Sequence, residues 1–412
     1  MSTLFRNKAF LIVTGSDLLQ NLAIWIRNMA ILYYVMDQTQ GNPIAVSLIT
    51  VLEYAPIFVF SVIGGALADR WNPKRTMILG DMLSALSIVM IIAVLSSGYW
   101  QILYVATFVS SIVSQFSQPS SVKIVKRNVE EEHVQSAIAI TQSGQSLFLI
   151  LGPIVGTFIY TVMGIQTSMY ALLILFITSA ILLTFLPKDS AQRETDTSLL
   201  ADIKEGWQYV GQSRSLKMLS LVFVCVGLSS GLISPLEIFL ITERLGLEQT
   251  SLQFLSGVSG LGLLIGGGIA AALSGKLNQT LTLMVGVLCL AVTTMGEVLS
   301  SWFWLTLVIS FLSSISLAFI NVIISTYLVT QIDEHLIGRV NGTITPLFMG
   351  AMLLGSSMAG VLMNNTSLFI VYIISVTVMI LSILPGMRIQ FRNEQTAPVN
   401  TLNPEVAHQA AD

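Results

Sequence analysis

The chain is built from long apolar runs separated by short polar breaks. Each run is long enough to cross a bilayer, which takes roughly 20 apolar residues in a helix. The runs are continuous and lack the short alternating pattern of a membrane barrel, so we expect helices. They predict six helices near 9–36, 43–68, 75–97, 99–121, 134–161 and 165–186, and six more near 216–243, 250–275, 279–300, 302–329, 336–363 and 366–386.

The two sets of six resemble each other at a constant spacing of about 202 residues. Glu131 to Val134 recurs as Asp333 to Leu336, and Gly64-Gly65 recurs as Gly267-Gly268. Such an offset indicates a duplicated unit. The predicted fold is all-α, with twelve transmembrane helices in two pseudo-symmetric six-helix bundles and a substrate site at the midplane between them. We expect bundles at 1–186 and 216–387, a cytoplasmic linker with a short amphipathic helix at 187–215, and a disordered cytoplasmic tail at 388–412.

The basic residues fix a predicted orientation. If the N-terminus is cytoplasmic, 17 of the 19 Lys and Arg residues fall on the cytoplasmic side. Cytoplasmic loops are enriched in Lys and Arg. We therefore expect a multi-pass protein of the cytoplasmic membrane with both termini inside, whose first apolar span is too long for a cleaved signal and is retained.

The composition is typical of an integral membrane protein. Hydrophobic residues make up 54% of the chain, charged residues only 10%, and the mean hydropathy is +0.79. No phosphate-binding loop, Ser/His/Asp set or metal-ligand cluster is visible, and both cysteines fall in apolar runs. We expect neither an enzyme nor a nucleic-acid-binding protein, and no cofactor or metal.

The break between the second and third runs carries the clearest motif. Gly64, Asp69, Arg70, Lys74 and Arg75 resemble the loop 2-3 motif of the major facilitator superfamily. That resemblance implies the twelve-helix fold and a cytoplasmic latch between the halves, with Asp69 against the positive end of the helix that begins near Gly338 and Arg339. Asn72 replaces the glycine of the motif, and asparagine tolerates a left-handed turn.

The fifth run carries a second resemblance. Gly144, Gly152, Pro153 and Gly156 are similar to a glycine-proline motif of exporters in this superfamily. The glycines would let helices approach closely, and the proline would bend the helix. Together with the loop motif, this run makes the chain similar to the macrolide-efflux and siderophore-exporter branch of the drug:proton antiporters. The resemblance implies efflux by alternating access, and a monomer.

Ionisable groups inside a membrane are costly, so each needs a partner, a water-filled cavity or a function. Asp17 and Glu237 are our candidates for proton coupling, because burial favours the neutral form of a carboxyl and so allows it to take up and release a proton. Arg27 and Glu53 lie at similar predicted depths and could form a cavity ion pair, either structural or broken during transport. Asp17 could instead line a cavity as a polar group, and Glu237 could pair with Arg244.

Other polar residues complete the prediction. Gln20, Asn21, Trp25 and Asn28 share one face of the first helix and are expected to line the substrate cavity. Aromatic residues of the first two helices, Tyr33 and Tyr54 among them, could line a drug-binding surface or simply pack. Glu297 is expected to reach the lipid headgroups. Asp81 is expected to stabilise the start of the third helix or to belong to the latch.

These features predict a secondary transporter that exports amphipathic or cationic small molecules, such as drugs or macrolides, in exchange for protons. Its partners would be the substrate, protons and the lipid bilayer. Export of a siderophore, translocation of a lysophospholipid, and facilitated uptake of a nutrient remain alternatives at this point.

Overall fold

A computed structural model describes residues 4–187, 199–273, 276–332 and 334–389 of the chain. At residues 61–70, 199–203, 334–335 and 337, only the backbone is described. Every regular element in these ranges is a helix. The expected disordered tail at 388–412 falls almost entirely outside the described residues.

The first half consists of five continuous helical elements. They are α1 (Lys8–Thr39), α2 (Pro43–Arg70), α3 (Pro73–Ser96), α4 (Leu103–Asn128) and α5 (Glu131–Thr184). Element α5 contains two membrane spans, because Gly164 interrupts it with a non-helical backbone, φ of 71° and ψ of 179°. Glycine adopts this conformation without the steric cost that a side chain brings. The first half therefore has six spans.

The second half starts with α7 (Arg214–Ile233), which continues through a 3-10 turn at Ser234–Leu236 into α8 (Glu237–Phe239) and a π-helical turn at Leu240–Arg244. Pro235 lies in this irregular stretch, where it removes a backbone donor from the helix. The remaining helices are α9 (Leu252–Leu273), α10 (Gln279–Leu299), α11 (Phe303–Gln331), α12 (Glu334–Asn365), α13 (Leu368–Leu381) and α14 (Ile383–Gly386). These too make six spans.

Ten of the described helical segments are long and apolar enough to cross a membrane by themselves. Helix α4 is not among them because it is rich in serine and glutamine, and α5 is one segment with two spans. The prediction of twelve transmembrane helices is confirmed. The fourth helix was predicted at 99–121 and is found at Leu103–Asn128, because Lys123, Lys126 and Arg127 extend the helix instead of ending it.

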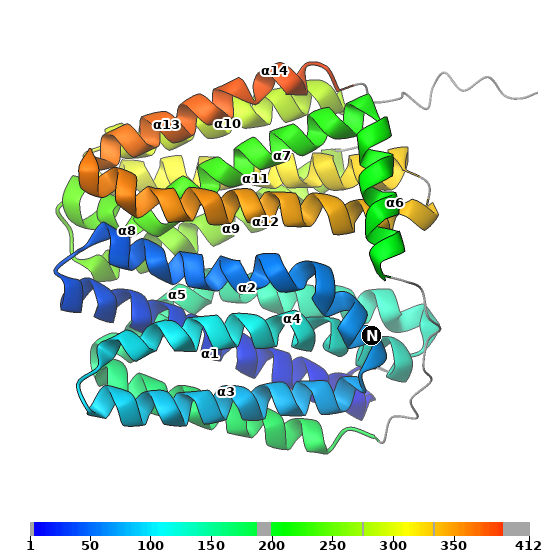
Figure 1. Cartoon of the computed structure of the whole chain (residues 1–412), viewed down its shortest axis with the longest axis vertical. Helices are drawn as coiled ribbons and strands as arrows, with labels where there is room; N and C mark the ends of the chain where they lie inside the picture. The colour runs from blue at the N-terminus through cyan, green and yellow to red at the C-terminus, as the bar shows by residue number, and fades with distance from the viewer. Residues whose placement is uncertain (1–3, 188–198, 274–275, 333, 390–412) are drawn as a thin grey trace, which may run out of the picture.

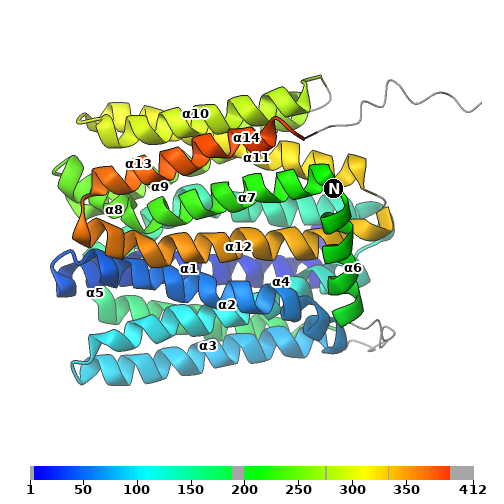
Figure 2. The same ribbon diagram turned by 45° about the horizontal axis from the view of Figure 1, so that its top comes forward.

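The two halves lie side by side as separate bundles (Figure 1). The short helix α6 (Leu199–Gln212) crosses one end of the molecule, the same end that holds the N-terminus (Figure 1, Figure 2). We call this the linker end and the opposite one the far end. Helices α2 and α12 run along each other at the boundary between the bundles in both views.

Glycines allow the bundles to approach closely toward the far end. A Cβ atom at Gly360 of α12 would lie 2.5 Å from the carbonyl oxygen of Pro43 in α2. A Cβ atom at Gly260 of α9 would lie 2.7 Å from the carbonyl oxygen of Leu149 in α5. Both separations are too short for a real Cβ atom, so only glycine permits these backbone contacts. The bundles are therefore in close backbone contact in the far half of the boundary.

Candidate functional site

Asp17 borders a cavity inside the first bundle. The cavity has a volume of about 100 Å³, and its lining includes Gln118 and Ser121 of α4 and Gln142 of α5. The Ser121 hydroxyl donates a hydrogen bond of 2.7 Å to Asp17 Oδ2. The carboxyl is partly exposed and lies in the linker-end half of α1. A carboxyl with one neutral donor and a polar cavity beside it is placed to exchange a proton with water.

A second carboxyl of the first bundle, Asp81, is completely buried. Gln20 Nε2 donates to Asp81 Oδ1 at 2.8 Å, and Ser179 Oγ donates to Oδ2 at 2.5 Å. Ser16 Oγ lies 2.7 Å from Ser179 Oγ and completes a network across α1, α3 and α5. The expectation that Asp81 stabilises the start of a helix is wrong, because α3 begins at Pro73 and Asp81 lies more than two turns inside it. Its membership of the latch stays a prediction.

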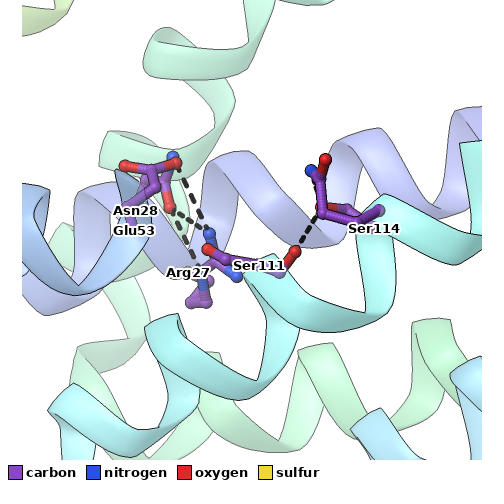
Figure 3. A network of polar contacts seen from close by, with 6 residues as sticks. Arg27, Asn28, Glu53, Ser111 and Ser114 are labelled. Carbon is purple, nitrogen blue, oxygen red and sulfur yellow. Dashed lines mark hydrogen bonds and ion pairs between the residues drawn. The ribbon is translucent and has the colours of Figure 1, made fainter. Parts of the chain in front are cut away.

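Arg27 and Glu53 face each other from α1 and α2 (Figure 3). Arg27 Nη2 lies 4.0 Å from Glu53 Oε1, and the arginine side chain is only 4% exposed. Asn28 connects the two groups: its Oδ1 accepts from Arg27 Nε at 3.1 Å and from Nη2 at 2.7 Å, and its side chain is also hydrogen-bonded to Glu53. The Arg27 Nη1 atom is buried without a hydrogen-bond partner among the described residues.

Glu237 lies where α7 loses regularity, near the far end of the second bundle. Its carboxyl makes no hydrogen bond or ion pair with any other described side chain, and its side chain is partly exposed. It interacts electrostatically with Tyr54 of α2, which is also close to Glu53. Arg244 does not pair with it, since Arg244 Nη2 instead donates to the carbonyl oxygen of Leu299 at 2.7 Å. Glu237 is thus an acidic group at the boundary between the bundles.

Glu297 differs from its prediction. Its side chain is 8% exposed, is hydrogen-bonded to Ser310 of α11, and interacts electrostatically with Glu237. The expectation that it reaches the headgroups is wrong. Glu297 lies near the end of α10, but its side chain turns inward to Ser310 and not outward to lipid. The sequence does not reveal that this face of α10 turns toward α11.

The four residues of α1 expected to line a substrate cavity contact other parts of the first bundle. Gln20 belongs to the Asp81 network, and Asn21 Nδ2 donates to the carbonyl oxygen of Asp17 in its own helix at 2.8 Å. Asn28 connects Arg27 and Glu53. The ring of Trp25 covers Gly152 of α5 and stays partly exposed. Tyr33 is fully buried and is hydrogen-bonded to Thr157 at 2.9 Å, so it packs and does not line a surface.

The glycines of the exporter-like run hold α5 against α1. A Cβ atom at Gly152 would lie 2.3 Å from the Trp25 ring, and one at Gly156 would lie 2.6 Å from the Trp25 carbonyl oxygen. A Cβ atom at Gly144 would lie 3.2 Å from the Leu18 side chain of α1. Pro153 is buried between Gly152 and Gly156. The motif therefore sets the spacing of two helices within the first bundle.

The close approach of α1 and α5 can be tested by substitution. We expect Gly156→Ala to lower the stability of the detergent-solubilised protein by about 1–3 kcal/mol, because the nearest atom to the new methyl group is the backbone oxygen of Trp25, which cannot move aside as a flexible side chain can. The matched control is Gly267→Ala in α9, where nothing lies within 4 Å of the added atom and stability should be unchanged or higher. Thermal unfolding followed by intrinsic fluorescence compares the two variants. Equal stability of both would contradict the packing argument.

The loop 2-3 motif is partly described. Asn72 has φ of −69° and caps α3, its side chain accepting from the Arg75 N–H at 3.0 Å, so the expected left-handed turn is replaced by a helix cap. Lys74 Nζ donates to the carbonyl oxygens of Thr184, at 2.8 Å, and Leu186, and so holds the end of α5 within the first bundle. Arg75 is exposed. Gly64, Asp69 and Arg70, toward the end of α2, are described by their backbone alone.

Helix α6 attaches to the second bundle at the linker end. Arg339 Nη1 donates to Glu205 Oε1 at 2.8 Å. A Cβ atom at Gly206 would lie 2.5 Å from the Arg339 carbonyl oxygen, so α6 and α12 touch through their backbones. The beginning of α12, which was expected to receive Asp69, is thus in contact with the linker helix α6.

At the far end, polar side chains join the bundles. Asp37 of α1 accepts from Gln249 Nε2, just before α9, at 2.9 Å. Tyr160 Oη of α5 donates to the other carboxylate oxygen of Asp37 at 3.1 Å. These residues carry no signal in the sequence, because nothing in a single sequence shows that they meet. The hydrogen bond between Asp37 and Gln249 therefore links the two bundles at the far end.

Solved structures share this architecture. The nucleoside transporter NupG superposes with a TM-score of 0.76, covering 93% of this chain and 100% of its own at 10% identity. The human organic anion transporter MFSD10 superposes with a TM-score of 0.63 over 92% of this chain and 99% of its own at 16% identity. These identities are low, so the similarity concerns the fold.

Relatives in sequence cover most of the chain. An uncharacterized MFS-type transporter of Bacillus subtilis, YfiS, is 28% identical over 374 residues, 87% of this chain and 88% of its own. Macrolide efflux protein A of Streptococcus pyogenes is 26% identical over 345 residues, 79% and 82%. The multidrug efflux pump Tap of Mycolicibacterium fortuitum is 24% identical over 375 residues, 86% and 90%. The family model described as Major Facilitator Superfamily matches residues 16–356 and 219–410, and the chain belongs to that superfamily.

Proposed function

We propose that this transporter exports amphipathic or cationic small molecules from the cell in exchange for protons. The observation that carries the proposal is the presence of carboxyl groups inside both bundles, without a basic partner among the described residues: Asp17 beside a polar cavity and Glu237 at the bundle boundary. Relatives named for macrolide and multidrug efflux support the direction of transport. Asp17 and Glu237 are the proposed proton carriers.

Alternating access supplies the mechanism. In this conformation the far half of the boundary is held by the glycine contacts and by Asp37 with Gln249. Under the proposed orientation the far end faces the outside, and the linker end, with both termini, faces the cytoplasm of a cell-membrane protein. Substrate would enter from the linker end, displace a proton, and leave when the bundles rock open at the far end. The protein would work as a monomer.

The far-end contact provides a test of the rocking motion. We expect Gln249→Ala to raise the population open at the far end about two- to tenfold, because one side-chain hydrogen bond across the bundles is lost. Spin labels attached after Tyr99→Cys and Trp302→Cys, with Cys225 and Cys289 replaced by serine, would report the separation of the bundles. The control is Thr250→Ala, whose hydroxyl bonds locally to Glu248. Identical distance distributions in the Gln249 and Thr250 variants would contradict this role.

The proposed function itself is tested in inverted membrane vesicles that contain the protein. An inward proton pump acidifies the vesicle interior, and uptake of ethidium and of a panel of macrolides and amphipathic cations is followed. We expect accumulation that depends on the acid interior and stops when an ionophore collapses the gradient. Uptake that is indifferent to the proton gradient, or transport only in the opposite direction, would support a nutrient facilitator instead.

A further inference from the structure

A cluster of oxygen-bearing side chains lies in the far half of the second bundle and extends to the boundary. It combines Glu237 at the break in α7, Glu297 of α10 and Tyr372 of α13. The two carboxyl groups interact electrostatically with each other, and the Tyr372 phenol interacts with both. Three helices of one bundle therefore direct polar groups to one place.

The cluster lacks a positive charge. Among the described residues, no basic side chain forms an ion pair with Glu237 or Glu297. Arg27 faces Glu53, and Arg244 is bonded to the Leu299 carbonyl oxygen. Two carboxyl groups close together in an apolar interior cannot both be ionised unless a cation joins them. The cluster has the electrostatics of a cation site.

The Tyr372 hydroxyl points to a missing partner. The tyrosine is fully buried, and its oxygen makes no hydrogen bond with any described residue. A buried hydroxyl without a partner costs free energy, so its presence calls for a ligand or a function. Its neighbours are the two carboxyl groups, so a cation or a hydrogen-bond donor at the cluster would satisfy all three groups at once.

The surroundings hold Glu297 in place and leave Glu237 free. Ser310 is hydrogen-bonded to Glu297, and its Oγ lies 2.8 Å from Ser259 Oγ of α9. Glu237 makes no such bond and remains partly exposed. Tyr54 of the first bundle interacts electrostatically with Glu237 and offers an aromatic ring from across the boundary. Aromatic rings attract alkylammonium groups through cation–π interactions, and a nearby carboxylate adds an opposite charge.

We propose that Glu297, Glu237 and Tyr372 bind the cationic group of the transported molecule, with Tyr54 closing the site from the first bundle. This inference rests on the proposed function, because it assigns a binding role within the export pathway. It adds Glu297 and Tyr372 to the transport machinery and gives Glu237 a partner in it. Substrates that carry an ammonium or phosphonium centre are favoured over neutral or anionic molecules of the same shape.

The test uses the full-length protein in detergent at one fixed pH. Equilibrium dialysis measures binding of tetraphenylphosphonium and of tetraphenylborate, which have the same shape and opposite charge. We expect binding of the phosphonium ion only. Glu297→Gln should weaken it about tenfold or more, as expected when one charged contact is lost. Tyr372→Phe, which keeps the ring, should weaken it by a smaller factor.

Glu243→Gln is the matched control, because Glu243 is an exposed carboxyl in the π-helical turn that follows α8. It should leave phosphonium binding unchanged. If Glu297→Gln does not fold, Tyr372→Phe decides, since replacing an unpaired buried hydroxyl by hydrogen does not threaten the fold. Unchanged phosphonium binding in a folded Glu297→Gln or Tyr372→Phe variant, or equal binding of the borate, would overturn the site.

The two proposals fail in different ways. Charge-selective binding that depends on Glu297, in a protein that shows no proton-driven uptake in vesicles, would retain the site and reject antiport. Proton-driven uptake together with phosphonium binding that is indifferent to Glu297 would retain antiport and reject the site.

Discussion

Proton-driven accumulation of substrate in inverted vesicles is expected to fall to the level of vesicles without the protein in both Asp17→Asn and Glu237→Gln. Each substitution keeps the shape of the side chain and removes its ability to carry a proton. The amide oxygen of asparagine at position 17 can still accept the Ser121 hydrogen bond, so the cavity beside it should persist. The loss would therefore reflect coupling and not folding.

Exchange of labelled for unlabelled substrate separates coupling from binding. Exchange across the membrane needs no net movement of protons, so we expect it to persist at least in Asp17→Asn. Glu243→Gln, which changes an exposed acid in the same half as Glu237, should behave as wild type in both assays. Unchanged proton-driven accumulation in both variants would remove the proposed roles of Asp17 and Glu237.

The second large effect is expected at the buried arginine. Arg27→Gln should destabilise the protein by about 3–5 kcal/mol, because Glu53 then loses its only cationic neighbour among the described residues. The double variant Arg27→Gln with Glu53→Gln should recover most of this stability, since no charge is left unpaired. Thermal unfolding in detergent measures both, and Arg244→Gln, which changes an exposed arginine at the far end of the second half, serves as the surface control.

Transport by the double variant distinguishes the two interpretations of the pair. A stable double variant that still exports substrate would make Arg27 and Glu53 structural. A stable but inactive one would assign the pair a step in the transport cycle. An Arg27→Gln protein as stable as wild type would contradict the pairing itself.

The helices could be predicted from the sequence because lipid imposes a simple rule on them. Long apolar runs have to form helices, and Gly164 shows how a single glycine separates two spans that the backbone otherwise continues. The boundaries of α4 were harder to predict from the sequence, since its serines, glutamines and basic end carry little of the apolar signal. Asn72 illustrates a finer error: one residue type suits both a left-handed turn and a helix cap.

The candidate site was predictable only in part. Asp17 and Glu237 stand out because a carboxyl inside an apolar run is unusual. Asp81 and Glu297 were misjudged because they lie nearer to helix ends, and position along a helix does not reveal which neighbour its side chain faces. The network of Asp81 with Gln20 and Ser179 joins residues far apart in the chain, as does the contact of Glu297 with Ser310. Only the packing of the helices brings these groups together.

If protons and substrate compete for carboxyl groups inside the bundles, substrate binding has to release protons, and this release can be measured. The compound exported best in the vesicle panel is added to the detergent-solubilised protein in weakly buffered solution with a pH indicator. We predict that the wild-type protein releases protons on binding and that Asp17→Asn and Glu237→Gln release fewer. Binding without proton release in the wild type, or equal release in all three proteins, would contradict the account.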